Sequence, residues 1–317
     1  MLINTVTNYS LPDDTEWLVE RIRNSKRVIT IGTGRSGDVA EVARAVKQGG
    51  GFLTAITSNP SSILSALSDR TILIPGASRK ESDYFANQIT GASNVPLTPM
   101  GTLFELRSLL FSLSLVSQLR GLNFTTTHKS LIDAIANFSP KTGYYADLYE
   151  LIPKTSKNCE YKKTVIIGEG LSGIVGKFFA TRLRHCSKPG EERYVSFWLD
   201  KGSVSVGKND LVFIISGSGG GISPNLAKKG KEKGAKVVAL TSFVDSELSA
   251  NSDYIVEVPG RIKVKLKGLR SSYYPQDPMY SVFELRSLFF LETLIYYIAS
   301  KDGITESDMK QMHSDFT

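Results

Sequence analysis

The chain has 317 residues, of which 41% are hydrophobic and 22% are charged, a composition typical of a globular protein with a packed core. The formal net charge of +7 is moderate and selects no single class of anionic partner. Two basic runs, 228–236 and 261–267, contain no aromatic residues, so we expect solvent-exposed faces there and no nucleic-acid site.

Two cysteines, Cys159 and Cys186, are too few for a disulfide framework, and neither has a partner at C-x-x-C spacing. We therefore expect a cytoplasmic protein without a zinc site or another metal. Residues 1–17 lack a basic region followed by an apolar one, so no signal peptide is expected. No run of about 18 apolar residues occurs, and no membrane span is predicted.

The predicted elements alternate between strands and helices. Apolar runs without polar alternation predict strands buried on both faces, as in a parallel sheet covered by helices. Such runs occur at 28–32, 52–57, 71–75, 164–168, 211–216, 236–241 and 254–259. Two further helices, 128–138 and 145–151, are predicted where the first set of strands gives way to the second.

The sequence also repeats itself. Residues 28–76 align with 212–260 without a gap at an offset of 184, and 17 of the 49 pairs are identical. The likeness resumes at Pro99 and Pro278, where PMGTLFELRSLLF matches PMYSVFELRSLFF. An internal duplication explains this pattern better than chance does.

The duplication predicts two three-layer α/β/α units with parallel sheets of the doubly wound, flavodoxin-like kind. The first unit, residues 1–125, is shortened, and the second unit, residues 126–317, has one more strand, loop and helix. The apolar helices after Phe104 and Phe283 have faces that need burial, so we expect them to pair the units as an intramolecular pseudo-dimer. Pairing of whole chains into a homo-oligomer is left open.

Glycine-rich loops follow three of the predicted strands, where open α/β sheets bind their ligands. These loops are GTGRSG (32–37), GEGLSG (168–173) and SGSGGG (216–221). Glycine allows close approach of the backbone, the next helix offers unpaired N–H groups, and Ser223 followed by Pro224 suits a helix start. Ser216 and Ser218 add hydroxyl groups, so the last loop predicts an anion site, most simply for phosphate.

Glycine loops of this kind also occur in three different settings. Glycines between a strand and a helix often serve packing alone. A dinucleotide site needs an acidic residue at the end of the second strand, where this chain has Thr57 and Ser58. No Gly-Lys-Ser/Thr follows any of the three loops, which excludes a P-loop.

The repeated FELRSL places Glu105 and Glu284 in strongly apolar helix starts. Shielding by apolar neighbours raises the pKa of a carboxyl group, which suits a general base near neutral pH. The alternative is a structural Glu favoured by the helix dipole. Of the three histidines, His128 is expected on the surface, His185 at a helix end, and His313 in a tail helix that Thr305 caps.

As a set, these motifs resemble the sugar isomerase (SIS) domain family in a tandem arrangement, most closely the 6-phospho-3-hexuloisomerases. The likeness rests on both GxG-x-SG loops, ISGSGGG (215–221), AITSNP (55–60), the IPG and VPG strand ends, both FE motifs and ESDMKQMH (306–313). It covers almost the whole second copy and about residues 27–120 of the first.

The resemblance implies a sugar phosphate ligand and no cofactor. It assigns phosphate binding to the serine loop and first-loop serine, here Ser216, Ser218 and Ser172, with Ser223 as a partial substitute for missing loop residues. In the first copy it points to Arg35 and Ser36. The FE glutamate, Glu284 or Glu105, would be the proton-transferring base, and His313 would assist it.

This chain departs from the family pattern at several of these positions. Gly220 and Gly221 stand where the family has Glu and Thr, Leu171 replaces an Arg, and neither copy carries every motif. The predicted function is isomerisation of a hexose or hexulose phosphate through a cis-enediol(ate), in one composite site or two. The alternative is a regulator that binds a sugar phosphate without turning it over.

Overall fold

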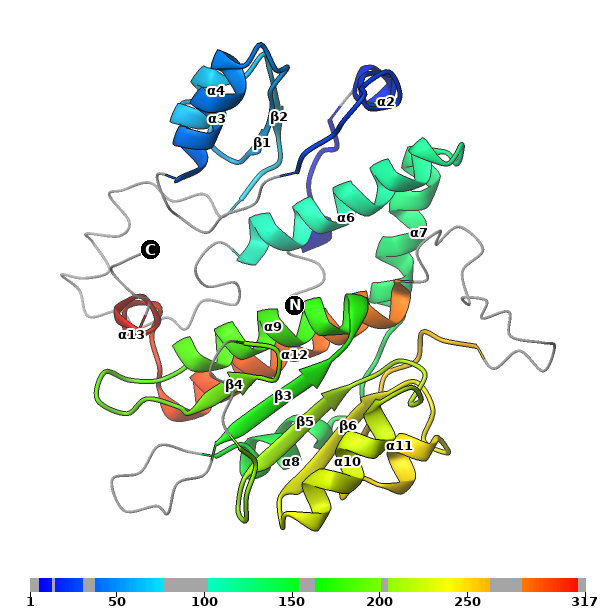
Figure 1. Ribbon diagram of the computed structural model, residues 1–317, viewed down its shortest axis with the longest axis vertical. Coiled ribbons are helices and arrows are strands. Elements are labelled where there is room, and N and C mark those ends of the chain that lie inside the picture. Colours follow the sequence, from blue (N-terminus) through cyan, green and yellow to red (C-terminus); the bar gives the residue numbers. More distant parts are fainter. Residues whose placement is uncertain are drawn as a thin grey trace. The chain divides into compact units, whose positions relative to one another are not determined.

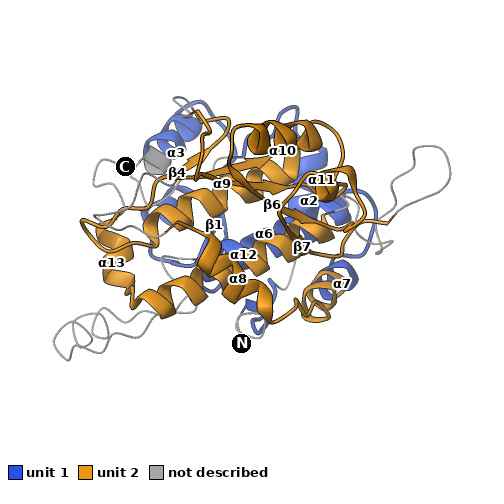
Figure 2. Ribbon diagram, turned by 90° about the horizontal axis from the view of Figure 1, so that it is seen from below, with its two compact units in different colours: residues 1–92, 101–129, 314–317 blue, residues 93–100, 130–313 orange. Residues whose placement is uncertain are grey.

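The structure is a computed structural model, and it describes residues 6–12, 15–30, 38–76, 102–153, 163–200, 205–262 and 281–312. The chain forms two compact units, coloured separately in Figure 2. Among the described residues, their division falls between residues 129 and 130, within helix α7 (Phe124–Ala136). Among the helices that the structure describes, none is long and apolar enough to span a membrane.

Unit 1 has a two-stranded parallel sheet in its described part. Strands β1 (Thr54–Thr57) and β2 (Arg70–Leu73) pair with Thr54 opposite Arg70. The helices are α2 (Glu16–Arg23), α3 (Asp38–Gln48), α4 (Ile63–Leu67) and α6 (Thr102–Leu119). Its core joins α2, β2, α6 and the start of α7 through Leu18, Val19, Ile72, Ile74, Phe111, Leu115 and Phe124.

Two expectations for unit 1 are wrong. Residues 28–30 form no strand, and the side chains of Val28 and Ile29 are 53% and 73% exposed, because an apolar run becomes a strand only where another strand pairs with it. Residues 31–32 lie outside the described residues. His128 is buried, because its ring packs against Phe124 and its Nδ1 lies 3.0 Å from the Ser114 hydroxyl.

Unit 2 contains a five-stranded, fully parallel sheet in the order β4-β3-β5-β6-β7. The strands are β3 (Thr164–Gly168), β4 (Val195–Phe197), β5 (Leu211–Ile215), β6 (Lys236–Thr241) and β7 (Tyr254–Glu257). Four of them confirm the predicted strands, with ends that differ by up to two residues. The three-residue β4 was not predicted, because it is too short to show a period.

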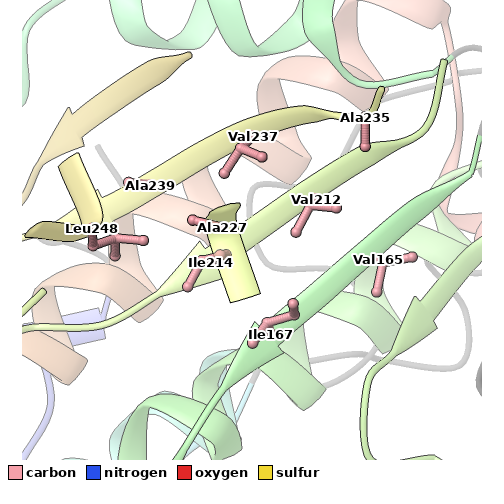
Figure 3. Packing of buried hydrophobic residues seen from close by; sticks show 9 residues of the cluster. All are labelled: Val165, Ile167, Val212, Ile214, Ala227, Ala235, Val237, Ala239 and Leu248. Atoms are coloured by element: carbon pink, nitrogen blue, oxygen red, sulfur yellow. The ribbon is translucent and has the colours of Figure 1, made fainter. Parts of the chain in front are cut away.

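Helices cover both faces of this sheet (Figure 1). The helices of the unit are α8 (Gly143–Leu151), α9 (Gly170–His185), α10 (Ser223–Glu232), α11 (Glu247–Ala250), α12 (Val282–Asp302) and α13 (Glu306–Gln311). On one face, Ala227 of α10 and Leu248 of α11 meet alternate side chains of β3, β5 and β6 (Figure 3). On the other, Phe179 of α9 packs against Phe213 of β5, and α12 packs on α9 and α8.

Two helix starts were predicted from single residues, with different outcomes. The Thr305 hydroxyl accepts from the Asp308 N–H and the Asp308 carboxylate reaches back, so the cap of α13 is confirmed as a capping box. The cap of α10 is Ile222, which places Ser223 inside the first turn and corrects the prediction that Ser223 is the cap. Helix α10 therefore begins one residue earlier than the sequence suggested.

Several details recur in both units. The pairing of Thr54 with Arg70 matches that of Val238 with Tyr254, at the offset of 184 that relates the two sequences. Ser62 and Ser246 both cap the following short helix through their side chains. The same chain positions therefore have the same local structure in both units.

Candidate functional site

The strand order of unit 2 locates a ligand site by topology. Counted along the unit, the order is 2-1-3-4-5, so the direction in which successive strands are added to the parallel sheet reverses at the β3–β5 pair. In open α/β sheets, ligands bind outside the carboxyl ends of the strands at such a switch point. The loops that follow β3 and β5 are GEGLSG and SGSGGG, so both glycine loops of unit 2 lie at this point.

Two glycines of the loop 216–221 are required by packing. A Cβ on Gly217 would lie 2.7 Å from the ring of Phe283. Gly219 has φ +62°, and a Cβ there would lie 2.3 Å from the Ser246 hydroxyl. The first half of the loop is therefore pressed against α12 and the cap of α11, so packing alone accounts for these two glycines.

The second half of the loop faces open space. A Cβ on Gly220 would meet only the Ser218 hydroxyl, at 3.8 Å, and one on Gly221 only the Glu169 carboxylate, at 3.9 Å. The Ser218 hydroxyl accepts from the Gly220 N–H at 3.3 Å, while Ser216 and Ser218 are both half-buried. This half of the loop has the room that a ligand needs to approach the backbone.

The start of α12 is held against this loop by its own motif. Phe283 packs so closely on Gly260 that a Cβ on the glycine would lie 2.4 Å from the Phe283 backbone. The buried Arg286 donates to the carbonyls of Pro259, at 2.8 Å, and Ala134, at 2.7 Å. Phe, Arg and the strand-ending Pro-Gly together place the remaining motif residue, Glu284, at the carboxyl end of the sheet.

Glu284 is a buried carboxylate with two donors on one oxygen. Its Oε1 accepts from the Ser172 hydroxyl at 2.9 Å and from Arg261 Nη2 at 2.6 Å. Its Oε2 is buried and has no hydrogen-bond partner among the described residues. Burial raises the pKa of Glu284 above its usual value, and Arg261 and Ser172 oppose that shift. The expectation of a shielded carboxyl group is confirmed at this position.

Arg261 was missed, because the sequence placed it in a basic run expected to be solvated. Its side chain is only 21% exposed and forms the ion pair with Glu284. Its backbone N–H donates to the Ser242 hydroxyl at 3.2 Å, and Nε lies 2.8 Å from the position of a Cβ on Gly217. The available signal was its place directly after the VPG strand end, one of the repeated motifs.

The structure brings only some of the other predicted site residues together. Ser172, expected to hold phosphate, is buried and donates to Glu284 instead. Glu105 is exposed, so the expectation of apolar shielding is wrong for the first copy. Arg35, Ser36 and His313 lie outside the described residues. The structure thus joins Ser172 and Glu284, beside the loop of Ser216 and Ser218, and Ser223 is buried in the first turn of α10.

This arrangement suits proton transfer next to an anion. The buried carboxylate has an oxygen, Oε2, that can accept a proton, and the adjoining loop offers backbone N–H groups and hydroxyls. Within the described ranges, no group of three His, Cys, Asp or Glu side chains could hold a metal ion.

Part of this sequence is similar to a known family and to proteins of known name. The SIS domain family model matches residues 159–284. A 3-hexulose-6-phosphate isomerase of Methylomonas aminofaciens is 32% identical over 155 residues, which are 48% of this chain and 80% of that protein. A protein of the same name from Bacillus subtilis is 33% identical over 149 residues, covering 47% of this chain and 76% of the relative.

The fold has a counterpart among solved structures. A crystal structure of a hypothetical protein aligns with 26% identity and a TM-score of 0.50, covering 63% of this chain and 97% of that one. The parallel α/β fold, the glycine loops at its switch point and the curated relatives all indicate the same family. The chain belongs to the SIS domain family, among relatives that include hexulose phosphate isomerases.

Proposed function

We propose that the chain is a phosphosugar isomerase that acts on a hexose or hexulose phosphate. The observation that carries this proposal is the buried carboxylate of Glu284 beside the open half of the loop 216–221. Two relatives are named 3-hexulose-6-phosphate isomerase, which supports a six-carbon sugar phosphate as the substrate class.

In the proposed reaction, Glu284 moves a proton between adjacent carbons through a cis-enediol(ate). The loop holds the phosphate through backbone N–H groups and the hydroxyls of Ser216 and Ser218. Phosphate binding far from the reacting carbons converts binding energy into positioning. Ser172 acts on the base rather than the phosphate, since its hydroxyl donates to Glu284.

We extend the proposal to the rest of the chain as a tandem arrangement, with residues 1–125 as a shortened unit and 126–317 as the complete one. The matching strand register and helix caps of the two units support a duplication. Pairing of the units through the FELRSL helices, and assistance by His313, stay predictions. Replacement of His313 by Ala should reduce turnover less than replacement of the base.

Proton exchange tests the proposal directly. The chain is incubated in D2O with hexulose, hexose and pentose phosphates, and deuterium incorporation and product are followed by NMR. Glu284→Gln keeps the shape and removes the basicity, so turnover should fall by about two to four powers of ten while binding is nearly kept. Glu105→Gln, in the same motif of the first copy, is the matched comparison. A loss of similar size there would show that both copies contribute a base.

A second function is favoured by the loop itself. Gly220 and Gly221 provide neither the carboxylate nor the hydroxyl that the family pattern has there. A protein that binds a sugar phosphate without converting it, as a regulator does, would tolerate that loss. If the wild type binds a sugar phosphate but shows neither exchange nor product with any of them, the isomerase proposal fails and the regulator stands.

A further inference from the structure

Arg261 lies between the glycine loop and the buried carboxylate. Its Nη2 donates to Glu284 Oε1 at 2.6 Å, while its Nε lies 2.8 Å from the position of a Cβ on Gly217. The guanidinium carbon is 5.9 Å from the ring centre of Phe283, whose own ring touches the loop. One guanidinium group therefore adjoins both parts of the site.

The two ends of this contact differ in their access to a ligand. The Arg261 side chain is 21% exposed, whereas the Glu284 side chain is only 8% exposed. A guanidinium group has five N–H donors in a fixed fork that fits a carboxylate or a phosphate equally well. Arg261 is therefore the more accessible of the two groups, and an anion at the loop can compete with Glu284 for its guanidinium.

We propose that Arg261 changes its partner when an anion occupies the loop 216–221. It holds Glu284 while the loop is empty, and it turns toward the bound phosphate when the loop is filled. The carboxylate is then released at the moment when the substrate is in place. This inference rests on the proposed function, because it takes the loop as the anion site.

The exchange has a consequence for protons. Arg261, after β7, is the charged group that lowers the pKa of Glu284, and Ser172, on α9, adds a neutral donor, while burial raises the pKa. If the guanidinium turns away, burial is less opposed and Glu284 binds a proton more readily. Binding of the anion should therefore be coupled to proton uptake. The carboxylate of Glu169 also adjoins the loop, near Gly221, and must be tested separately.

Calorimetry with sulfate tests the exchange without any turnover. Sulfate is a dianion like phosphate, but it does not change its own protonation near neutral pH. Titrations in two buffers of different ionisation enthalpy, between about pH 5 and 8, give the number of protons taken up per sulfate bound. We expect the wild type to take up a fraction of one proton. Glu284→Gln should bind sulfate without uptake.

The arginine variants separate charge from geometry. Arg261→Met should bind sulfate about 10- to 100-fold more weakly, because it loses a charge-assisted donor, and should show no uptake. Arg261→Lys keeps the charge without the fork and should retain part of both effects. Glu169→Gln is the matched control, since it removes a carboxylate beside the same loop and should leave the uptake unchanged. Thermal unfolding of each variant establishes that it is folded.

The outcomes distinguish this inference from the proposed function. Sulfate binding that depends on Ser216 and Ser218 but occurs without proton uptake overturns the exchange and leaves the isomerase proposal intact. Uptake that persists in Glu284→Gln, or vanishes in Glu169→Gln, also overturns it. If the wild type binds no sulfate, or if Ser216→Ala with Ser218→Ala binds it equally well, this inference fails together with the proposed phosphate-binding role of the loop, whereas the isomerase proposal is decided by the proton-exchange experiment.

Discussion

Alanine substitutions at Gly217 and Gly220 add the same methyl group to one loop with opposite consequences. A Cβ on Gly217 would lie 2.7 and 2.9 Å from two ring carbons of Phe283 and 2.8 Å from Arg261 Nε. Phe283 is fully buried and is itself in contact with Gly260, so its ring has no room to retreat. A Cβ on Gly220 would meet its nearest neighbour, the Ser218 hydroxyl, at an ordinary 3.8 Å.

The contact distances set the size of the effect. An extra methyl group forced into a packed core costs about 1 to 3 kcal/mol of stability. At about 2 to 4 °C per kcal/mol for a domain of this size, Gly217→Ala should lower the Tm by about 2 to 12 °C. Gly220→Ala should stay within about 0.5 kcal/mol of the wild type, as a substitution without close contacts does.

Thermal and urea unfolding followed by circular dichroism measure both variants. Sulfate binding adds a second measurement, because displacement of Phe283 and Arg261 should weaken the site in Gly217→Ala. A Gly217→Ala variant as stable as the wild type would refute the expected clash and would mean that the start of α12 yields freely. Equal destabilisation of Gly220→Ala would refute the contrast and would mean that the loop is packed along its whole length.

Four further changes have distinct expected results. Gly220→Glu should fold normally and, if the altered loop limits catalysis, should raise proton exchange above the wild-type rate; unchanged exchange would argue against that limit. Gly221→Thr should lose about 1 to 2 kcal/mol in urea unfolding, because φ is +70° there and a side chain is strained. Arg286→Met should lower the urea midpoint by an amount equivalent to about 2 to 5 kcal/mol, because the buried Ala134 carbonyl and the partly buried Pro259 carbonyl lose a charged donor; a loss below about 1 kcal/mol would contradict that role. Burial lowers the pKa of His128 below its usual 6.5, so the unfolded chain binds more protons than the folded one at mildly acidic pH. The free energy of unfolding should therefore fall as the pH drops below about 6.5. A pH dependence of unfolding that is the same in His128→Gln as in the wild type would refute this.

Local patterns in the sequence were enough to predict most strands and one helix cap of unit 2. Apolar runs of five or six residues predicted β3, β5, β6 and β7, because a strand covered on both faces needs apolar side chains throughout. Thr305 predicted the cap of α13 in the same way, since both partners of a capping box, Thr305 and Asp308, lie within one turn. The glycine loops and the repeated motif also indicated the family, because each is a short run of neighbouring residues.

The same local sequence could not decide which glutamate is buried. FELRSL is identical in both copies, yet Glu284 is buried and Glu105 is exposed. The environment of Glu284 comes from Ser172, 112 residues away, and from Arg261, 23 residues away. Likewise, the apolar run at 28–30 has the composition of a strand but forms none, because pairing requires a neighbour. Short-range patterns determined the elements and the family, whereas burial, ion pairing and strand pairing depend on groups distant in the chain, which only the tertiary structure brings together.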